Sequence, residues 1–165
     1  VKRPQVGVLI EVPAAVYQAR LLAKAADFVA VGSNDLTQYM LAVDRNNPRV
    51  AGLYEEVHPA VIGALREVAR ATHAEEEKPL GICGELAGTP VGAVLLMAMG
   101  YHVLSMNATH LPKVKWVMRN FKRRDARRIL AKVLRMDTAQ EVSRFVNQQL
   151  VEAGLERVVP SRQVG

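Results

Sequence analysis

Short apolar runs alternate with alanine- and leucine-rich segments along most of the chain. The first run covers residues 6–10 (VGVLI), and further runs cover residues 28–31, 79–82 and, less strongly, 103–106. Continuous apolar runs of this length are typical of parallel strands buried on both faces, because a strand with one solvated face would alternate apolar and polar residues. The pattern therefore predicts a parallel sheet of four strands.

Helical patterns lie between these strands and continue after the last one. We predict helices at residues 14–26, 36–42, 58–77 and 89–99, followed by helices at 111–121, 124–135 and 138–153. Pro13 and Pro90 stand where a first helical turn accepts proline, and Thr89 is a suitable N-cap. A strand followed by a helix, repeated four times, predicts an α/β fold with right-handed crossovers.

Polar and reactive residues gather where the predicted strands end. They are Glu11, Asn34, Asp35, Cys83 and Ser105, whereas the strand interiors lack such residues. A (β/α) barrel carries its chemistry at this rim, and a closed barrel needs eight units in about 250 residues. Because we count four units, we predict a partial (β/α)8 TIM barrel with extra C-terminal helices, a single domain over residues 1–165 with a flexible tail at 154–165.

The net charge of +6 is concentrated in the C-terminal third of the chain. A solvated helix face is one interpretation of this cluster, and attraction of an anionic partner is the other. Aromatic residues make up 5% of the chain and do not interleave with the cluster, which argues against a nucleic-acid surface. The cluster comprises Arg119, Lys122, Arg123, Arg124, Arg127, Arg128, Lys132 and Arg135.

The single cysteine, Cys83, suits a reducing cytoplasm, since it cannot form an internal disulfide. No apolar run approaches the roughly 20 residues of a membrane span, so we expect no membrane segment. The sequence begins Val-Lys-Arg-Pro and shows neither a signal peptide nor an initiator methionine, so we expect a piece of a longer protein. Cys83 itself is either a reactive thiol at a strand-to-helix turn or a buried, inert side chain.

Glu11 and Asp35 end two strands that we expect to be neighbours. Neighbouring parallel strands lie about 4.8 Å apart, so the two carboxylates can converge on one point. Mg²⁺ is commonly held by one or two carboxylates together with water and substrate oxygens. The alternatives are that Asp35 caps the following helix or is a solvated loop acid.

Four segments of the chain, in order, resemble the phosphoenolpyruvate (PEP)-binding barrel at the C-terminal end of the PEP-utilising enzymes. These segments are residues 8–14 (VLIEVPA), 32–39 (GSNDLTQY), 42–45 (AVDR) and 81–88 (GICGELAG), and the resemblance extends over residues 6–153. The family includes PEP–protein phosphotransferases, pyruvate phosphate dikinase and PEP synthase. The segment around the cysteine is most similar to the protein phosphotransferases, of enzyme I type, and residues 154–157 (GLER) are similar to their nitrogen-related branch.

The resemblance implies a metal site and an acid. Glu11 and Asp35 match the family's Mg²⁺ ligands, with Mn²⁺ as an alternative ion. Cys83 matches the acid that protonates the enolate carbon to give pyruvate. A thiol suits this role because it is a weak acid that keeps its proton at neutral pH, and the sequence places no lysine or histidine beside Cys83 that would favour a thiolate nucleophile.

The resemblance also implies how PEP is held. Asn34, with the backbone of Gly32 and Ser33, matches the contacts to the phosphate and carboxylate oxygens of PEP. Arg45 matches an arginine that lines the same site.

The implied reaction transfers the phosphoryl group of PEP to a histidine on a separate swivelling domain, and from there to a phosphocarrier protein. None of the four histidines here lies in a motif recognised as phosphorylated, and we expect His58 and His110 to stand at helix starts. We therefore expect this chain by itself to be inactive. A non-catalytic dimerisation or regulatory module of the same enzyme, or a pyruvate phosphate dikinase or PEP synthase type of enzyme, is the alternative.

Half a barrel leaves the apolar interior of the sheet open. Exposing about 1,000 Å² of apolar surface would forgo about 25 kcal/mol, more than the 5–15 kcal/mol that stabilises a typical domain. We therefore expect a homodimer in which a second copy covers this face, helices that shift over it, or a tendency to aggregate.

Overall fold

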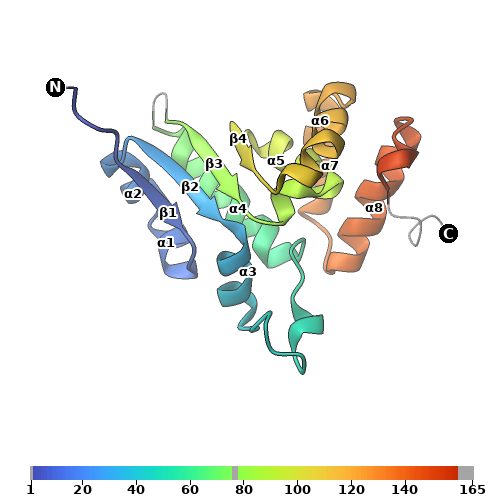
Figure 1. Cartoon of the computed structure of the whole chain (residues 1–165), viewed down its shortest axis with the longest axis horizontal. Helices are drawn as coiled ribbons and strands as arrows, with labels where there is room; N and C mark the ends of the chain where they lie inside the picture. Colours follow the sequence, from blue (N-terminus) through green and yellow to red (C-terminus); the bar gives the residue numbers. More distant parts are fainter. Residues whose placement is uncertain (1, 76–77, 160–165) are drawn as a thin grey trace.

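Four parallel strands form the sheet around which the chain folds (Figure 1). The computed structural model describes residues 2–75 and 78–159. The strands are β1 (Gly7–Ile10), β2 (Phe28–Gly32), β3 (Leu80–Cys83) and β4 (Val103–Ser105), and they lie in the order β1-β2-β3-β4. The predicted parallel α/β arrangement is therefore confirmed, and the strands that precede Glu11 and Asp35 are neighbours.

The helices follow the strands in the predicted alternation. The helices are α1 (Pro13–Tyr17), α2 (Ala19–Ala25), α3 (Ser33–Leu41), α4 (Pro59–His73), α5 (Pro90–Met99), α6 (Leu111–Asn120), α7 (Arg123–Val133) and α8 (Ala139–Glu152). Short 3₁₀ turns cover Ala51–Leu53, Leu86–Gly88, Ala108–His110 and Glu156–Val158.

One face of the sheet is covered by helices. Ile10, Val31, Leu80 and Ile82 point to this face and are almost wholly buried. The α5 helix packs against α6 and α7 and is buried on nearly all sides, which explains its almost uninterrupted apolar sequence. The core therefore lies between the sheet and its helices.

The other face of the sheet is open. Leu9 in β1 is 48% exposed, Phe28 in β2 is 37% exposed and Val103 in β4 is 57% exposed. These residues alternate with the buried ones, because successive side chains of a strand point to opposite faces. An exposed apolar sheet face is what the sequence predicts for half a barrel.

Most predicted helix ends lie within two residues of the observed ones, and three features differ by more than that. The single helix expected over residues 14–26 is two helices, because Gln18 leaves helical geometry (φ −103°, ψ 7°). The helix expected from residue 36 begins at Ser33, with Gly32 as its N-cap. The helix expected to reach residue 77 ends at His73, and residues 76–77 lie outside the described part of the chain.

The C-terminal helices pack back onto the rest of the molecule. Thr138 and Glu141 form a capping box at the start of α8, and Thr89 caps α5 as predicted. After α8, Leu155, Val158 and Val159 are buried in the core. Of the tail expected at residues 154–165, residues 160–165 lie outside the described part. Among the residues described, no helix is long and apolar enough to cross a membrane.

Candidate functional site

The strand register places two predicted rim residues, Cys83 and Ser105, in one row with Gly32. Gly32 in β2 pairs with Cys83 in β3, and Cys83 pairs with Ser105 in β4. Cys83 and Ser105 are exposed on the open face of the sheet. The carboxyl ends of β2, β3 and β4 therefore present a thiol and a hydroxyl side by side.

Cys83 is held at this rim by neighbours on β2 and at the start of α3. Its backbone carbonyl accepts a hydrogen bond from Ser33 Oγ at 3.0 Å, and its Sγ lies 3.6 Å from the carbonyl oxygen of Val31. Because the side chain is exposed, the alternative in which Cys83 is buried is wrong, and its reactivity stays a prediction.

Gly84 lets the turn after β3 approach the start of α3 closely. Its φ of 129° is one that side chains disfavour, and a Cβ there would lie 2.1 Å from Ser33 Oγ and 2.7 Å from Asn34 Oδ1. Asn34 Oδ1 accepts a hydrogen bond from the backbone N–H of Glu85 at 2.9 Å. The cysteine turn and the Ser33–Asn34 pair thus form one rigid unit.

The carboxylate of Glu11 lies over Gly32. A Cβ at Gly32 would meet Glu11 Oε1 at 2.4 Å, so glycine there leaves room for this side chain. Asp35 stands in the first turn of α3, and its Oδ1 lies 3.9 Å from Arg45 Nη2. Since Gly32 is the N-cap, the alternative in which Asp35 caps the helix is wrong.

The two acids do not by themselves make a full set of metal ligands. Within residues 2–75 and 78–159, no group of three or more His, Cys, Asp or Glu side chains is placed to hold a metal ion. Two carboxylates nonetheless fit Mg²⁺, which takes its remaining oxygens from water and phosphate. Shared binding of one ion by Glu11 and Asp35 stays a prediction.

Arg45, in the loop after α3, lies beside Asp35 and is not among the residues that line the cavity next to Cys83. Its backbone N–H donates to Gln38 Oε1 at 3.2 Å, and its side chain is about one-third exposed. In the described part of the chain, Arg45 Nη1 is buried without a hydrogen-bond partner. Tyr54 ties the far end of this loop to α3, because its hydroxyl donates to the carbonyl oxygen of Asn34 at 3.3 Å.

A cavity of about 580 Å³ opens beside the thiol. Cys83, Asn34, Ser105 and His110 line it, together with Glu56 from the loop. Glu56 Oε1 is buried and, among the residues described, has no hydrogen-bond partner. Burial, with the nearby negative charge of Glu85, raises the pKa of Glu56 to about 7. No sequence pattern marks Glu56 as a site residue, because two adjacent glutamates in a loop are typical of a solvated turn.

His58 and His110 stand at helix starts, as expected. His58 caps α4, its Nδ1 accepting from the backbone N–H of Ala60 at 3.2 Å, and His110 directly precedes α6. His102 Nδ1 accepts from the backbone N–H of Leu80 at 3.0 Å, at the opposite end of β3 from the thiol. Of these three, only His110 also lines the cavity.

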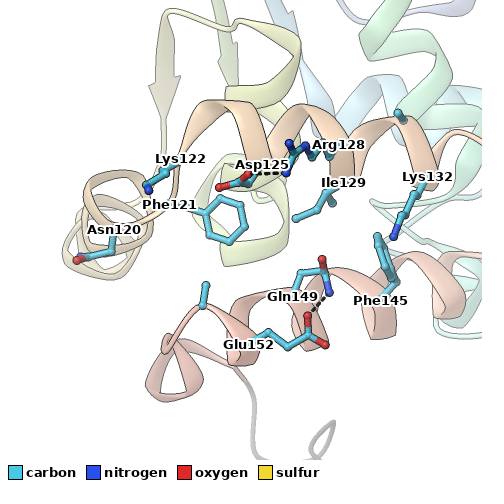
Figure 2. A pocket seen from close by; sticks show the side chains of 12 residues that line it. Asn120, Phe121, Lys122, Asp125, Arg128, Ile129, Lys132, Phe145, Gln149 and Glu152 are labelled. Atoms are coloured by element: carbon cyan, nitrogen blue, oxygen red, sulfur yellow. Dashed lines mark hydrogen bonds and ion pairs between the residues drawn. The ribbon is translucent and has the colours of Figure 1, made fainter.

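A larger cavity of about 760 Å³ lies between α7 and α8 (Figure 2). Two pairs of its charged and polar groups are engaged with one another: Arg128 Nη1 is 3.5 Å from Asp125 Oδ1, and Gln149 donates to Glu152 at 2.6 Å. Lys132 Nζ lies 5.4 Å from the ring centre of Phe145. Although larger, this cavity contains no thiol and lies away from the strand ends, so the cavity beside Cys83 is the better candidate site.

Comparison with known proteins gives a consistent family match. The family model described as "PEP-utilising enzyme, PEP-binding domain" matches residues 1–123. The chain is 43% identical over 151 residues to the phosphoenolpyruvate-protein phosphotransferase of Haemophilus influenzae, covering 92% of this chain and 26% of that protein. It is 39% identical over 155 residues to the Escherichia coli protein named phosphoenolpyruvate-dependent phosphotransferase system, covering 94% and 21%. The chain thus spans about a quarter or less of the length of these relatives.

Proposed function

The chain belongs to the PEP-utilising enzymes, matching their PEP-binding domain, and from this premise we propose that it is the PEP-binding part of a PEP–protein phosphotransferase. The names of the similar proteins favour this branch over pyruvate phosphate dikinase and PEP synthase. The observation that supports this proposal is the position of Cys83. Its exposed thiol lies at the carboxyl end of β3 and lines a cavity together with Asn34.

Cys83 is the proton donor in this proposal. Its S–H protonates the methylene carbon of the enolate as the phosphoryl group leaves, which gives pyruvate, and the thiolate then regains a proton from solvent. Its exposure in the cavity gives a substrate access to Sγ. Such a general acid contributes about 10²–10⁴-fold to rate.

The substrate is held, in this proposal, by Asn34, Arg45 and the backbone of Gly32 and Ser33. The guanidinium of Arg45, whose side chain is about one-third exposed, and the amide of Asn34 supply donors for phosphate and carboxylate oxygens. Asn34 is well suited to orient a ligand, since its own Oδ1 is already fixed by Glu85 N–H.

Glu11 and Asp35 would hold Mg²⁺, or Mn²⁺ in its place. The space over Gly32 that admits the Glu11 carboxylate, and the partly exposed carboxylate of Asp35, fit a hard cation that prefers oxygen ligands. Such an ion supplies stabilisation of the negative charge that develops on the enolate and phosphate oxygens.

The fold proposal follows from the open sheet face. We assign the four βα units to half of a TIM barrel, whose interior would be the face that carries Leu9, Phe28 and Val103.

A histidine elsewhere in the complete protein would take the phosphoryl group and pass it to a phosphocarrier protein. In this proposal the complete protein acts in the cytoplasm.

Calorimetric titration of the chain with PEP in the presence of Mg²⁺ tests the binding role. We expect saturable heat that Cys83→Ala preserves, because the thiol acts on the enolate carbon rather than on the anionic groups. The absence of binding by the wild-type chain would favour the second candidate, a non-catalytic module whose open sheet face mediates homodimerisation.

Exchange of the methyl protons of pyruvate, measured by NMR in the complete protein that carries these residues, tests the catalytic role. Cys83→Ala should lower PEP-dependent exchange by about 10²-fold or more, because no other thiol is present in the chain. A variant that keeps wild-type exchange would remove Cys83 from this role. Ser105→Ala, the neighbouring rim residue, is the matched control.

A further inference from the structure

Glu56 is a partly buried acid in the cavity that the proposed reaction leaves without a role. It reaches the cavity from the loop between α3 and α4, and lines it together with Cys83 and Asn34. Its Oε1 is buried and makes no hydrogen bond within the described residues. A carboxyl group with an unpartnered buried oxygen is costly to keep, and because the Glu56 side chain lines the cavity, a ligand there can supply a hydrogen-bond partner to this group.

The charges that face Glu56 disfavour its ionised form. Glu85, on the turn after β3, adds a second carboxylate near the same cavity. Tyr54 lies near Glu56 on the loop, and burial and the charge of Glu56 both raise the pKa of Tyr54, so the phenol stays neutral. His110 and Cys83 complete the titratable groups that line the cavity, while Arg45 is engaged near Asp35 and Tyr54.

We propose that Glu56 binds the anionic ligand of this cavity as a neutral acid, donating its proton to a ligand oxygen, and that loss of this proton expels the anion. This inference rests on the proposed PEP-binding function. The carboxylic acid supplies an O–H donor that an ionised glutamate lacks, whereas the ionised form places a negative charge against a phosphate or carboxylate.

Glu56 exchanges its proton near neutral pH, so its protonation state can control the affinity of the cavity for an anion there. Burial in the cavity, with Glu85 nearby, raises its pKa to about 7. The acid would therefore be mostly neutral one unit below this value and mostly ionised one unit above it. Affinity for an anion should fall as pH rises through this window, which is the direction required of a group that must be protonated to bind.

The experiment is a calorimetric titration of the chain from about pH 6 to about pH 8, with Mg²⁺ in constant excess. PEP tests binding itself, and pyruvate is the second probe because its carboxylate does not titrate in this range. Wild type should lose about tenfold in affinity for pyruvate over the range, and Glu56→Gln less than about twofold, since an amide keeps a donor at every pH. Glu55→Gln, the adjacent residue outside the cavity lining, should follow wild type.

Proton uptake gives a second readout that needs no variant. Titration with pyruvate at about pH 8 in two buffers of different ionisation enthalpy should show nearly one proton taken up per pyruvate bound. Loss of this uptake in Glu56→Gln would assign it to Glu56 rather than to His110. Wild type that binds without proton uptake would overturn the inference even if the variant fails to fold.

The outcomes separate this inference from the function on which it rests. Binding of PEP by wild type, with the same pH profile in Glu56→Gln, would overturn the role of Glu56 and leave the proposed function intact. No binding of PEP or pyruvate at any pH would overturn both.

Discussion

Cys83 shows how the position of one side chain depends on its place in a strand. It is the last residue of β3, and its neighbour Ile82 points into the helix-covered core. Because side chains alternate, Cys83 faces the open side, and Ser33 Oγ fixes its carbonyl. The chemistry of the thiol is thus available without any disruption of the core.

The rim residues could be predicted from the sequence, whereas Glu56 could not. Glu11, Asn34 and Cys83 follow apolar runs, so counting along the strands locates them at one edge. Glu56 is brought to the same cavity by the fold of a loop, held down where the Tyr54 hydroxyl meets the carbonyl of Asn34. No local pattern encodes a contact between a loop and a helix that lie 20 residues apart.

Glu56 should make the stability of the chain depend on pH. Its folded-state pKa of about 7 lies above the model-compound value of 4.5, so the folded protein keeps a proton that the unfolded chain releases in this window. Its contribution to the free energy of unfolding is therefore greatest at low pH and falls as pH rises to about 7. Glu56→Gln should stabilise the chain relative to wild type by about 2 kcal/mol more at pH 8 than at pH 5, after allowance for partial exposure.

Urea unfolding at the two pH values measures this difference. Glu55→Gln is the matched control, because it changes the neighbouring carboxylate outside the cavity lining. Equal pH dependence in the two variants would contradict the buried-acid interpretation.

At the scale of the helices, some boundaries can be predicted from the sequence and others cannot. The α5 helix was predicted within one residue of each end, because Thr89 and Pro90 mark its start and Gly100, at φ 89°, marks its end. The break between α1 and α2 was missed, since Gln18 lies within an alanine- and leucine-rich run that contains no proline or glycine. The earlier start of α3 was missed because Gly32 is both a strand end and an N-cap.

Two helical glycines should respond to alanine in opposite directions. A Cβ at Gly92 in α5 would lie 1.9 Å from the carbonyl oxygen of Leu86, so Gly92→Ala must force the Leu86–Gly88 turn away from the helix. We expect a loss of about 3 kcal/mol in the free energy of unfolding. Gly63→Ala in α4, where within the described residues no atom beyond the chain neighbours and the helix's own backbone lies within 4 Å of the Cβ, should instead gain about 0.5–1 kcal/mol.

Urea unfolding of Gly92→Ala and Gly63→Ala measures the change in the free energy of unfolding at each position. Near-equal effects at the two positions would show that helix propensity, rather than the close approach to Leu86, governs Gly92.

The capping box makes α8 sensitive to a single hydroxyl. Thr138 Oγ1 accepts from the backbone N–H of Glu141 at 3.2 Å, and the Glu141 carboxylate accepts in return from the backbone N–H of Thr138. Thr138→Ala should lower the free energy of unfolding by about 1 kcal/mol, measured by urea titration. Gln140→Ala, an exposed neighbour in the same turn, is the control and should leave it nearly unchanged.

At the scale of the whole molecule, the open sheet face is an apolar surface that no other described part of the chain covers. Leu9, Phe28 and Val103 lie exposed on a sheet whose edge strands β1 and β4 are unpaired on their outer sides within the described residues. The prediction of an open apolar face from the count of four strands is confirmed. What covers it, a second copy or further chain, stays a prediction.

This face should cause the isolated chain to associate. Sedimentation velocity should show a weight-average mass that rises with concentration, because apolar surface is removed from water when two copies meet. The double variant Leu9→Thr, Val103→Thr should reduce this rise, whereas Leu53→Thr, which removes an exposed leucine from the loop before α4, should not. A wild-type chain that stays monomeric at every concentration would contradict the prediction.

The strand register has a consequence for where the chain tolerates length changes. Inserting one residue between Leu80 and Cys83 would turn the thiol toward the helices and bring Ile82 or its replacement out to the cavity, since each step along a strand reverses the side-chain direction. The same insertion near Asn46 or Asn47 would only enlarge a solvated turn. Variation in length among natural versions of this domain should therefore concentrate in its loops, while the distance along the chain from Leu80 to Cys83 stays constant.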